Sequence, residues 1–281
     1  MSAGHSLWPH VPARPAPAAN VGLVSGESTP KQNRLLAALP QSEYERLLPH
    51  LEPVALPLGW TVHGPGDRQG FLYFLTEGIV SRLYVAHNGA STEFALTGRE
   101  GVIGVASFLG GVSMPSQALV LSAGHGYRLC ADLFTSEFMH DGLLPHLLLR
   151  YTQALITQVG QIAVCNRLHS VEQQLCRWIL SFLDRSSANE MLITQETIAE
   201  LLGVRRESIT EAAGRLQDAG MIHYSRGHVA VLDRRRLQAN VCECYAVVRR
   251  EYDRLVSPEH VVGLQPAFSA RETACRADHG A

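Results

Sequence analysis

The sequence of 281 residues predicts an α+β fold, with a β-domain first, a long helix next and a helical domain with a β-hairpin last. Three observations lead to this prediction. Short apolar runs alternate with Gly-rich turns across residues 54–133, a sustained helical pattern covers 143–166, and two short amphipathic segments precede a hairpin pattern within 193–232. At ~150 residues per domain, the length fits about two domains.

The composition is that of a folded protein and excludes a wholly disordered chain, since 46% of the residues are hydrophobic and 18% are charged. The net charge of −2 gives no global attraction to nucleic acid, so a binding surface for it must be local. No run reaches the ~18 apolar residues of a membrane helix, and no signal-peptide pattern opens the chain. We therefore expect a cytoplasmic protein with no membrane partner. The six cysteines form no CxxC pair, and a reducing compartment would keep them as thiols.

The two ends of the chain have the composition of tails. Residues 1–33 are rich in Pro, Ala, Gly and Ser, and residues 257–281 are similar, so both are expected to be flexible. Leucines then predict a short helix over 35–51, broken at Pro40, with Ser42 as the N-cap of its second part.

The β-domain is expected to span residues 34–142. Its strands are predicted at Val54–Leu56, Phe71–Leu75, Ile79–Val85, Thr92–Leu96, Ala118–Leu121 and Gly126–Leu129. Asn88-Gly89 between two of them is a strong hairpin signal. Several short strands at regular spacing predict an antiparallel roll, sandwich or barrel.

A long helix is expected over 143–168 as a dimerisation helix. Apolar residues recur at spacings of three and four, which predicts one buried face formed by Leu144, Leu148, Tyr151, Leu155, Val159, Ile162 and Asn166. This face could cover the β-domain, whereas the flanking Leu147, Leu149 and Ile156 favour a helix–helix seam between two copies. A second helix, Ser170 to Leu183, directs Val171, Leu175, Trp178, Ile179, Phe182 and Leu183 inward.

Residues 193–219 carry the most informative pattern. Thr194 is placed to cap a helix whose buried residues are Ile198, Leu201 and Leu202, and Gly203 supplies a sharp turn. The next helix, Arg205 to Ala219, buries Ile209, Ala212, Ala213 and Leu216, and its other face carries Arg205, Arg206, Ser208, Thr210, Glu211 and Arg215. Two short amphipathic helices joined at a Gly predict a helix-turn-helix.

A β-hairpin follows as the wing of a winged helix, and the DNA-binding domain is expected over 169–256. Met221–Ser225 and His228–Leu232 are its strands, and Arg226-Gly227 is its basic tip. Residues 205–236 hold seven Arg and four acidic residues, an excess of three positive charges. Arg can neutralise phosphate and can make bidentate contacts to guanine. Arg-rich helix pairs also occur in helical domains that bind no DNA, which remains the alternative.

These motifs resemble the bacterial cyclic-AMP receptor protein and fumarate–nitrate regulator (CRP/FNR) family of transcription factors over about residues 34–236. The helix-turn-helix similarity is carried by Gln195-Glu-Thr-Ile-Ala199, Leu202-Gly203 and Arg206-Glu207-Ser208, and the similarity of the strand turns by Gly101, Ile103, Gly104 and Phe108. The resemblance implies a cyclic-nucleotide-binding-like β-roll, a homodimer, and one recognition helix per subunit in successive major grooves.

The resemblance assigns roles to individual residues. Arg206 and Glu207 match the base-reading Arg-Glu pair of the family, contacting guanine O6/N7 and cytosine N4, with Ser208 beside them. Glu211 stands where the best-known member has a further basic residue, which implies a different target sequence. The full expected DNA-facing set is Arg205, Arg206, Glu207, Ser208, Thr210, Glu211, Arg215, Arg226 and His228, in which Arg205, Arg226 and His228 are expected to contact phosphate.

The nucleotide pocket that the resemblance implies is degraded. Gly104 is followed by Val105 where relatives have a Glu, and Pro115 stands where they have an Arg, so that only Ser116 is kept. Neither Val nor Pro replaces a charged group that binds a nucleotide. We therefore expect no cyclic-AMP binding.

The sequence also lacks clear signals for the other effectors known in the family. The first cysteine is Cys130, whereas relatives with an iron–sulfur cluster use N-terminal cysteines. The lone histidines His63, His87 and His125 do not indicate haem. Cys242 and Cys244 are expected on a C-terminal helix, Leu237 to Leu255, where spacing i, i+2 points them to different faces. A redox or metal site with Cys165 and Cys176 is an alternative to the preferred structural role, and no cofactor or metal is expected.

Together these patterns predict a sequence-specific DNA-binding transcription regulator that is not gated by cyclic AMP. Its expected partners are double-stranded DNA, a second copy of the chain and RNA polymerase, and the effector is unknown. No Ser/His/Asp order, phosphate-cradling Gly loop or carboxylate pair indicates an enzyme. The alternatives are a regulator that requires an unknown small-molecule or redox effector, and a ligand or interaction module that binds no DNA.

Overall fold

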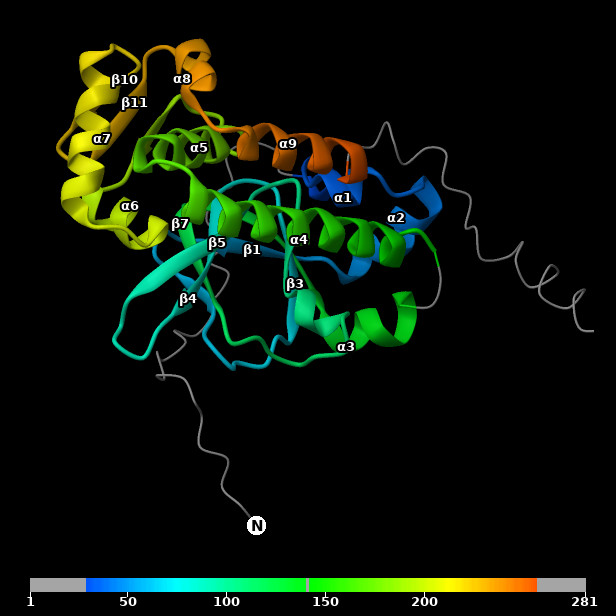
Figure 1. Ribbon diagram of the computed structural model, residues 1–281. Coiled ribbons are helices and arrows are strands. Elements are labelled where there is room, and N and C mark those ends of the chain that lie inside the picture. Colours follow the sequence, from blue (N-terminus) through cyan, green and yellow to red (C-terminus); the bar gives the residue numbers. More distant parts are fainter. Residues whose placement is uncertain (1–28, 140–141, 257–281) are drawn as a thin grey trace, which may run out of the picture.

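The computed structural model describes residues 29–139 and 142–256. A β-rich domain lies beneath two long, adjacent helices, and a smaller domain of helices and a β-hairpin lies at one end of the molecule (Figure 1). Of the tails predicted at 1–33 and 257–281, residues 1–28 and 257–281 lie outside the described residues.

The helices are α1 Arg34–Ala37, α2 Gln41–Leu47, α3 Ala131–Leu133, α4 Leu144–Leu168, α5 Val171–Leu183, α6 Gln195–Leu202, α7 Arg206–Asp218, α8 Arg234–Asn240 and α9 Glu243–Val256. The strands are β1 Glu52–Leu56, β2 Thr61–His63, β3 Phe71–Leu75, β4 Ile79–Val85, β5 Ser91–Thr97, β6 Val102–Ile103, β7 Gln117–Ser122, β8 Gly124–Cys130, β9 Glu190–Leu192, β10 Ile222–Ser225 and β11 His228–Val231.

The β-domain consists of two four-stranded antiparallel sheets, with strand orders β1-β8-β3-β6 and β2-β7-β4-β5. All six predicted strands are present. The sequence missed β2 and β6, which are only three and two residues long and too short to show an alternation. The predicted hairpin is confirmed between β4 and β5, where Gly89 has a φ of +84° and the Asn88 side chain accepts a hydrogen bond from the Ala90 amide.

A residue that the sequence places in the N-terminal tail belongs to the packed core of the β-domain. Asn33, which the sequence places in the N-terminal tail, is fully buried, and its Nδ2 donates to the carbonyls of Leu75 and Gly101 at 2.9 Å each. The prediction of Ser42 as an N-cap is wrong. Pro40 occupies the N-cap of α2 without a side-chain cap, since its backbone already turns the chain into the helix, and Ser42 lies inside the first turn.

Helix α4 lies close against the β-domain because a glycine faces its buried tyrosine. A Cβ on Gly101 would lie 2.5 Å from the ring of Tyr151. The Tyr151 hydroxyl lies 3.2 Å from both Arg82 Nη2 and Thr97 Oγ1, so its burial leaves it hydrogen-bonded. The predicted apolar face is buried at Leu144, Leu148, Tyr151, Leu155 and Ile162, whereas Val159 is half-buried and Asn166 is exposed.

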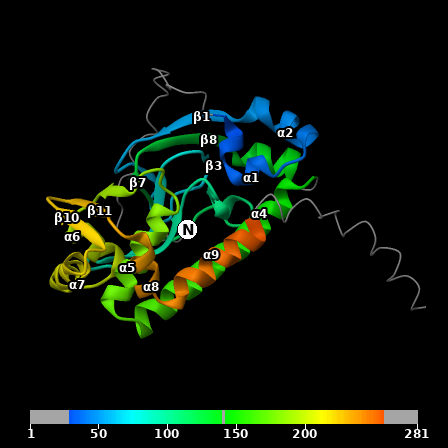
Figure 2. The same ribbon diagram turned by 90° about the horizontal axis from the view of Figure 1, so that it is seen from above.

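Helix α9 runs beside α4 along most of its length (Figure 2). Tyr252 Oη donates to Gln158 Oε1 at 2.9 Å, and Arg150 Nε donates to the carbonyl of Leu255 at 2.8 Å. The prediction of a single helix from Leu237 to Leu255 is wrong, because the chain forms two helices there, α8 and α9. The chain leaves α8 at Val241, which is extended, and α9 starts at Glu243, so the two helices point in different directions.

A buried carboxyl group joins the β-domain to α5. Glu93 of β5 is 4% exposed, and its oxygens accept hydrogen bonds from Ser81 Oγ at 2.6 Å and Trp178 Nε1 at 3.0 Å. Burial raises the pKa of Glu93 to about 7, although both hydrogen bonds oppose this shift.

This raised pKa predicts a pH-dependent stability that Glu93→Gln removes. A folded-state pKa of about 7, above the ordinary 4.5, gives stability that is present below pH 4.5 and is lost as the pH rises through 7. From pH 5 to pH 8 the wild type should therefore lose roughly 1–3 kcal/mol of unfolding free energy relative to Glu93→Gln. Denaturant unfolding at both pH values measures the difference. Glu200→Gln, on an exposed carboxylate, controls for the lost charge; a gap between wild type and Glu93→Gln that is independent of pH would contradict the prediction.

Candidate DNA-binding surface

Helix α6 begins and ends where the sequence predicts. Thr194 is its N-cap, and Thr194 Oγ1 accepts a hydrogen bond from the amide of Thr197 at 3.1 Å. Ile198, Leu201 and Leu202 are buried. Gly203 ends the helix with a φ of +67°, a left-handed conformation that glycine adopts without strain. The chain can therefore turn sharply into α7.

Helix α7 presents a polar face above a buried apolar one. Ile209, Ala212, Ala213 and Leu216 are its buried residues, as predicted, and α7 packs against α5 and α6. Thr210 Oγ1 donates to Gln195 Oε1 at 2.7 Å, which ties the exposed edge of α7 to the first residue of α6. The two helices thus have a fixed relative placement.

The start of α7 holds the predicted base-reading residues in the open. Arg205 is the N-cap residue and makes no side-chain cap, Arg206 and Glu207 lie exposed in the first turn, and Ser208 is half-buried. Arg206 Nε lies 3.6 Å from Glu196 Oε2 of α6. Both side chains are more than half exposed, and such surface pairs contribute at most ~1 kcal/mol. Arg206 can therefore be released to another acceptor at low cost.

Besides Arg206 and Thr210, two further predicted DNA-facing residues already have partners. Arg215 Nε lies 2.6 Å from Glu172 Oε2 in the first turn of α5, and His228 Nε2 lies 3.2 Å from Glu190 Oε2 of β9. Glu211 is exposed one turn beyond Glu207. The sequence did not reveal these pairings, because the partners lie 43 and 38 residues away.

The wing is confirmed, and it has a third strand. β10 and β11 pair as an antiparallel hairpin, and β9 adds to β11 in the register Met191↔Val229. At the tip, Arg226 has a φ of +50°, and Gly227 follows with a φ of +77°. Arg226 is the only residue besides glycine with a positive φ in the described chain, and its side chain is exposed.

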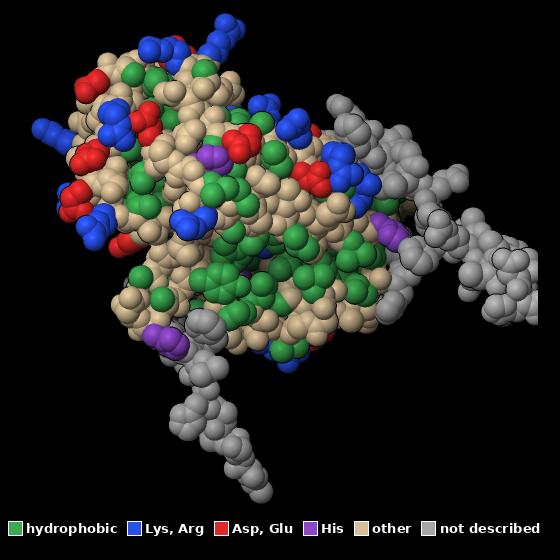
Figure 3. Space-filling model, in the orientation of Figure 1, with side chains coloured by type: hydrophobic (Ala, Val, Ile, Leu, Met, Phe, Trp, Pro, Cys, Tyr) green, Lys and Arg blue, Asp and Glu red, His purple; other side chains and the backbone are tan. Residues whose placement is uncertain are grey.

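Some arginines of this domain pair with other groups of the fold, and others have no partner among the described residues. Arg234 pairs with Asp184, and Arg236 donates to the carbonyl of Ala219 at 2.7 Å. Within 29–139 and 142–256, Arg205, Arg226 and Arg235 have no side-chain hydrogen bond or ion pair. Figure 3 shows basic side chains, which are all arginines in this domain, interspersed with acidic ones over α6, α7 and the wing. The surface available to an anion is therefore narrower than the count of arginines indicates.

The structure places the four residues of the predicted degraded nucleotide pocket as follows. Gly104 has a φ of +106°, and a Cβ there would lie 2.4 Å from the carbonyl oxygen of Phe71. Val105 and Ser116 are buried, and Pro115 is exposed. Gly104 is thus explained by the close approach of β3, and no charged side chain stands at Val105 or Pro115.

A cavity of about 210 Å³ lies beside Gly104, between β2, β3 and β6. His63 and Gln69 in its wall are bonded to each other, with their side-chain nitrogens 3.2 Å apart, and burial lowers the pKa of His63 to about 4. The imidazole is therefore neutral at pH 7. Arg68 also lines the cavity, but its side chain is 71% exposed and pairs with Asp132.

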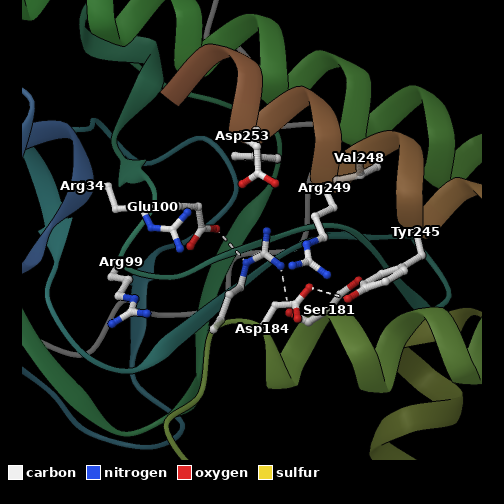
Figure 4. A pocket seen from close by; sticks show the side chains of 11 residues that line it. Arg34, Arg99, Glu100, Ser181, Asp184, Tyr245, Val248, Arg249 and Asp253 are labelled. Atoms are coloured by element: carbon white, nitrogen blue, oxygen red, sulfur yellow. Dashed lines mark hydrogen bonds and ion pairs between the residues drawn. The ribbon is translucent and has the colours of Figure 1, made fainter. Parts of the chain in front are cut away.

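A second pocket, of about 150 Å³, lies where the β-domain meets α5 and α9 (Figure 4). Arg185 Nε lies 2.7 Å from Glu100 Oε1, and Tyr245 Oη donates to Asp184 Oδ2 at 2.9 Å. These two pairs connect the β-domain, the end of α5 and α9 across the pocket, and Arg34, Arg99 and Arg249 also line it.

No helix in the described part of the chain is long and apolar enough to span a membrane. Residues 173–240, from α5 to the end of α8, match the family model of the Crp-like helix-turn-helix domain. No curated protein matches the sequence.

Solved structures match over most of the chain. A protein described as a transcriptional regulator of the Crp/Fnr family from Eubacterium rectale is 17% identical, with a TM-score of 0.60, and the match covers 73% of this chain and 96% of that one. FixK2 from Bradyrhizobium japonicum is 15% identical, with a TM-score of 0.57 and coverage of 68% and 98%. The c-di-GMP-responsive global regulator CLP from Xanthomonas campestris is 18% identical, with a TM-score of 0.54 and coverage of 68% and 99%.

These findings confirm the resemblance that the sequence predicted. The chain has the fold of solved CRP/FNR-family regulators, with antiparallel β-sheets like a cyclic-nucleotide-binding domain and a long helix, and its residues 173–240 match the model of the Crp-like helix-turn-helix domain.

Proposed function

We propose that this protein is a sequence-specific DNA-binding transcription regulator of the cytoplasm. The observation that supports this best is the exposed first turn of α7, where Arg206 and Glu207 stand free of strong partners beside the turn at Gly203. A recognition helix reads bases with its N-terminal residues, and this turn presents the side chains that do so.

The base contacts follow from the chemistry of the two side chains. Arg206 supplies two donors to guanine O6 and N7, and Glu207 accepts from cytosine N4. Glu211, one turn further, repels the acceptor edge of guanine and so selects against it. Ser208 and Thr210 lie beside these residues, and Thr210 also holds α6.

Phosphate contacts come from the flanking cations. Arg205 at the start of α7 and Arg226 at the wing tip are exposed, and each can neutralise one phosphate. His228 and Arg215 complete this set once they leave Glu190 and Glu172 for DNA.

A second copy of the chain binds along α4. Its large exposed hydrophobic residues are Leu149, Ile156, Val164 and Leu168, while two other faces of the helix are covered by the β-domain and α9. Figure 3 shows a band of hydrophobic side chains that follows α4. Pairing through this band gives a homodimer with two copies of α7, as a two-part DNA site requires.

Cyclic AMP does not control this activity. The positions that would hold its ribose and phosphate are the buried Val105 and the exposed Pro115. A different small molecule as effector is the second candidate, because the Xanthomonas regulator of similar fold is described as responsive to c-di-GMP. Contact with RNA polymerase accompanies either version.

Arg206→Ala tests the DNA-reading role. Fragments of the source genome are first selected on the purified full chain, without nucleotide, at ~150 mM salt, which suppresses non-specific binding. On the selected motif, Arg206→Ala should lose about 1–3 kcal/mol of binding free energy and relax the preference at one base pair. Arg250→Ala, an exposed arginine of α9, should bind as the wild type does. Equal affinities for wild type and Arg206→Ala would refute the assignment.

Calorimetry tests the loss of the nucleotide site. Titration of cyclic AMP into the full chain should give no binding in the low micromolar range, because no buried cation stands at the predicted phosphate position. A dissociation constant in that range, or tighter operator binding with added cyclic AMP, would show that the pocket functions.

Ile156→Asp tests the dimer. Ile156 is 67% exposed in the middle of the band, so a carboxylate there should leave the fold intact and shift the dimer towards one chain of 30.7 kDa. Sedimentation at micromolar concentration measures the mass. Ala246→Asp, on the exposed side of α9, should stay dimeric. A wild type that sediments only as one chain would contradict the proposal.

A further inference from the structure

Three cysteines and a histidine converge where the end of α4 meets the start of α9. Cys165 lies in the last turn of α4, His169 follows that helix, and Cys242 and Cys244 flank the first residue of α9. Their three sulfurs and an imidazole nitrogen all lie within 4.8 Å of one another. Cys165 Sγ is 3.6 Å from Cys242 Sγ, and Cys244 Sγ is 3.6 Å from His169 Nδ1.

The break between α8 and α9 creates this cluster. Cys165 and His169 are four residues apart and share one side of α4. On a continuous helix, Cys242 and Cys244 would point to different sides, as the sequence analysis assumed. Because Cys242 instead precedes α9, both sulfurs face the end of α4. Cys176, the other cysteine considered with them, belongs to a different part of the core.

We propose that this cluster binds one thiophilic divalent ion, for which Zn²⁺ is the best match, through three thiolates and His169 Nδ1. A tetrahedral Zn²⁺ with ordinary bond lengths separates two sulfurs by about 3.8 Å and a sulfur from a nitrogen by about 3.6 Å. The two distances of 3.6 Å are close to these values. Small side-chain adjustments bring the remaining pairs into the same range.

The surroundings of the cluster have the chemistry of an outer coordination shell. His169 Nε2 lies 3.3 Å from Glu243 Oε1, so that a carboxylate orients the ring and leaves Nδ1 as the ligand. Arg177 Nε of α5 donates to Cys165 Sγ at 3.2 Å, and Arg177 is 5% exposed. Three thiolates, one neutral imidazole and Zn²⁺ carry a net charge of −1, which Arg177 balances.

The buried arginine also favours a metal over a disulfide. In the described residues no carboxylate lies within 4 Å of Arg177, and its hydrogen-bond acceptor is the sulfur of Cys165. A thiolate bound to a metal accepts this hydrogen bond better than a disulfide sulfur does, and a Cys165–Cys242 disulfide would use only two of the four converging groups. A metal uses all four.

Cobalt and zinc binding by the full chain test the site. Protein stripped with a chelator under reducing conditions should take up one Co²⁺ per chain, with the sulfur-to-cobalt charge-transfer band and intense visible bands of a tetrahedral thiolate site. Zn²⁺ should displace it, and elemental analysis of the native protein should give one zinc per chain. Added Zn²⁺ should also raise the melting temperature of the stripped protein.

Variants locate the ion. Cys244→Ser should lose the tetrahedral cobalt spectrum and at least tenfold in Zn²⁺ affinity, since a hydroxyl is a poor ligand. Glu243→Gln, on a largely exposed carboxylate, keeps all four ligands and should lose roughly 10–100-fold in affinity, which guards against a folding defect in Cys244→Ser. Cys176→Ser replaces a buried cysteine outside the cluster and should keep one ion per chain.

Three results would overturn the proposal. The first is reduced wild type that takes up neither ion, and the second is a cobalt spectrum that persists unchanged in Cys244→Ser. The third is a Cys165–Cys242 disulfide in native protein that binds no metal once reduced. None of these measurements involves DNA, so they stand apart from the test of Arg206.

Discussion

The packing of α4 on two sides is the constraint on which the rest of this structure depends. One side presses Tyr151 against Gly101 of the β-domain, where any larger residue would clash with the ring. A second side is covered by α9, through contacts such as Tyr252 Oη with Gln158 Oε1. The remaining side exposes Ile156 and its apolar neighbours. Since α5 follows α4 after only two residues, the position of α4 also sets where the DNA-binding domain can lie.

Several arginines of the C-terminal domain already pair with other groups within the fold. Arg215, Arg234 and Arg236 hold α5, Asp184 and the end of α7, so only a few cations remain for phosphate. A protein that neutralises few phosphates has a low sequence-independent affinity for DNA. The slightly acidic net charge of the chain does not add to this affinity. Under the proposed function, specific binding then rests on base contacts near Arg206 and on doubling the site in a dimer. Specific DNA binding thus requires both the exposed side of α4, for dimerisation, and the first turn of α7, for base contacts.

Local patterns in the sequence predicted local structure well. Alternating apolar runs gave six strands, Thr194 and Gly203 marked both ends of α6, and Asn88-Gly89 marked a hairpin. The failures are non-local. β9 is a strand because β11 pairs with it, and Asn33 is ordered because two distant carbonyls accept its amide. The partners of Arg215 and His228, and the break at Val241, likewise depend on contacts that no short window contains. The sequence offered Cys165, Cys242 and Cys244 as an alternative metal site together with Cys176, but for the same reason it did not identify His169.

The cysteine cluster and the two domains meet through neighbouring residues of α5. Arg177 contacts Cys165, and the next residue, Trp178, donates its indole hydrogen to the buried Glu93 of β5. The same helix packs against α7. A change at the cluster therefore reaches the β-domain through Trp178, and α5 also contacts α7 directly. Such contact transmits a signal only if a bound ligand favours one placement of α5 over another, because an effector shifts an equilibrium by no more than its difference in affinity for the two states. These contacts connect the cysteine cluster to the β-domain and to α7. The free energy of coupling between them would equal the difference in ligand affinity between the two placements of α5.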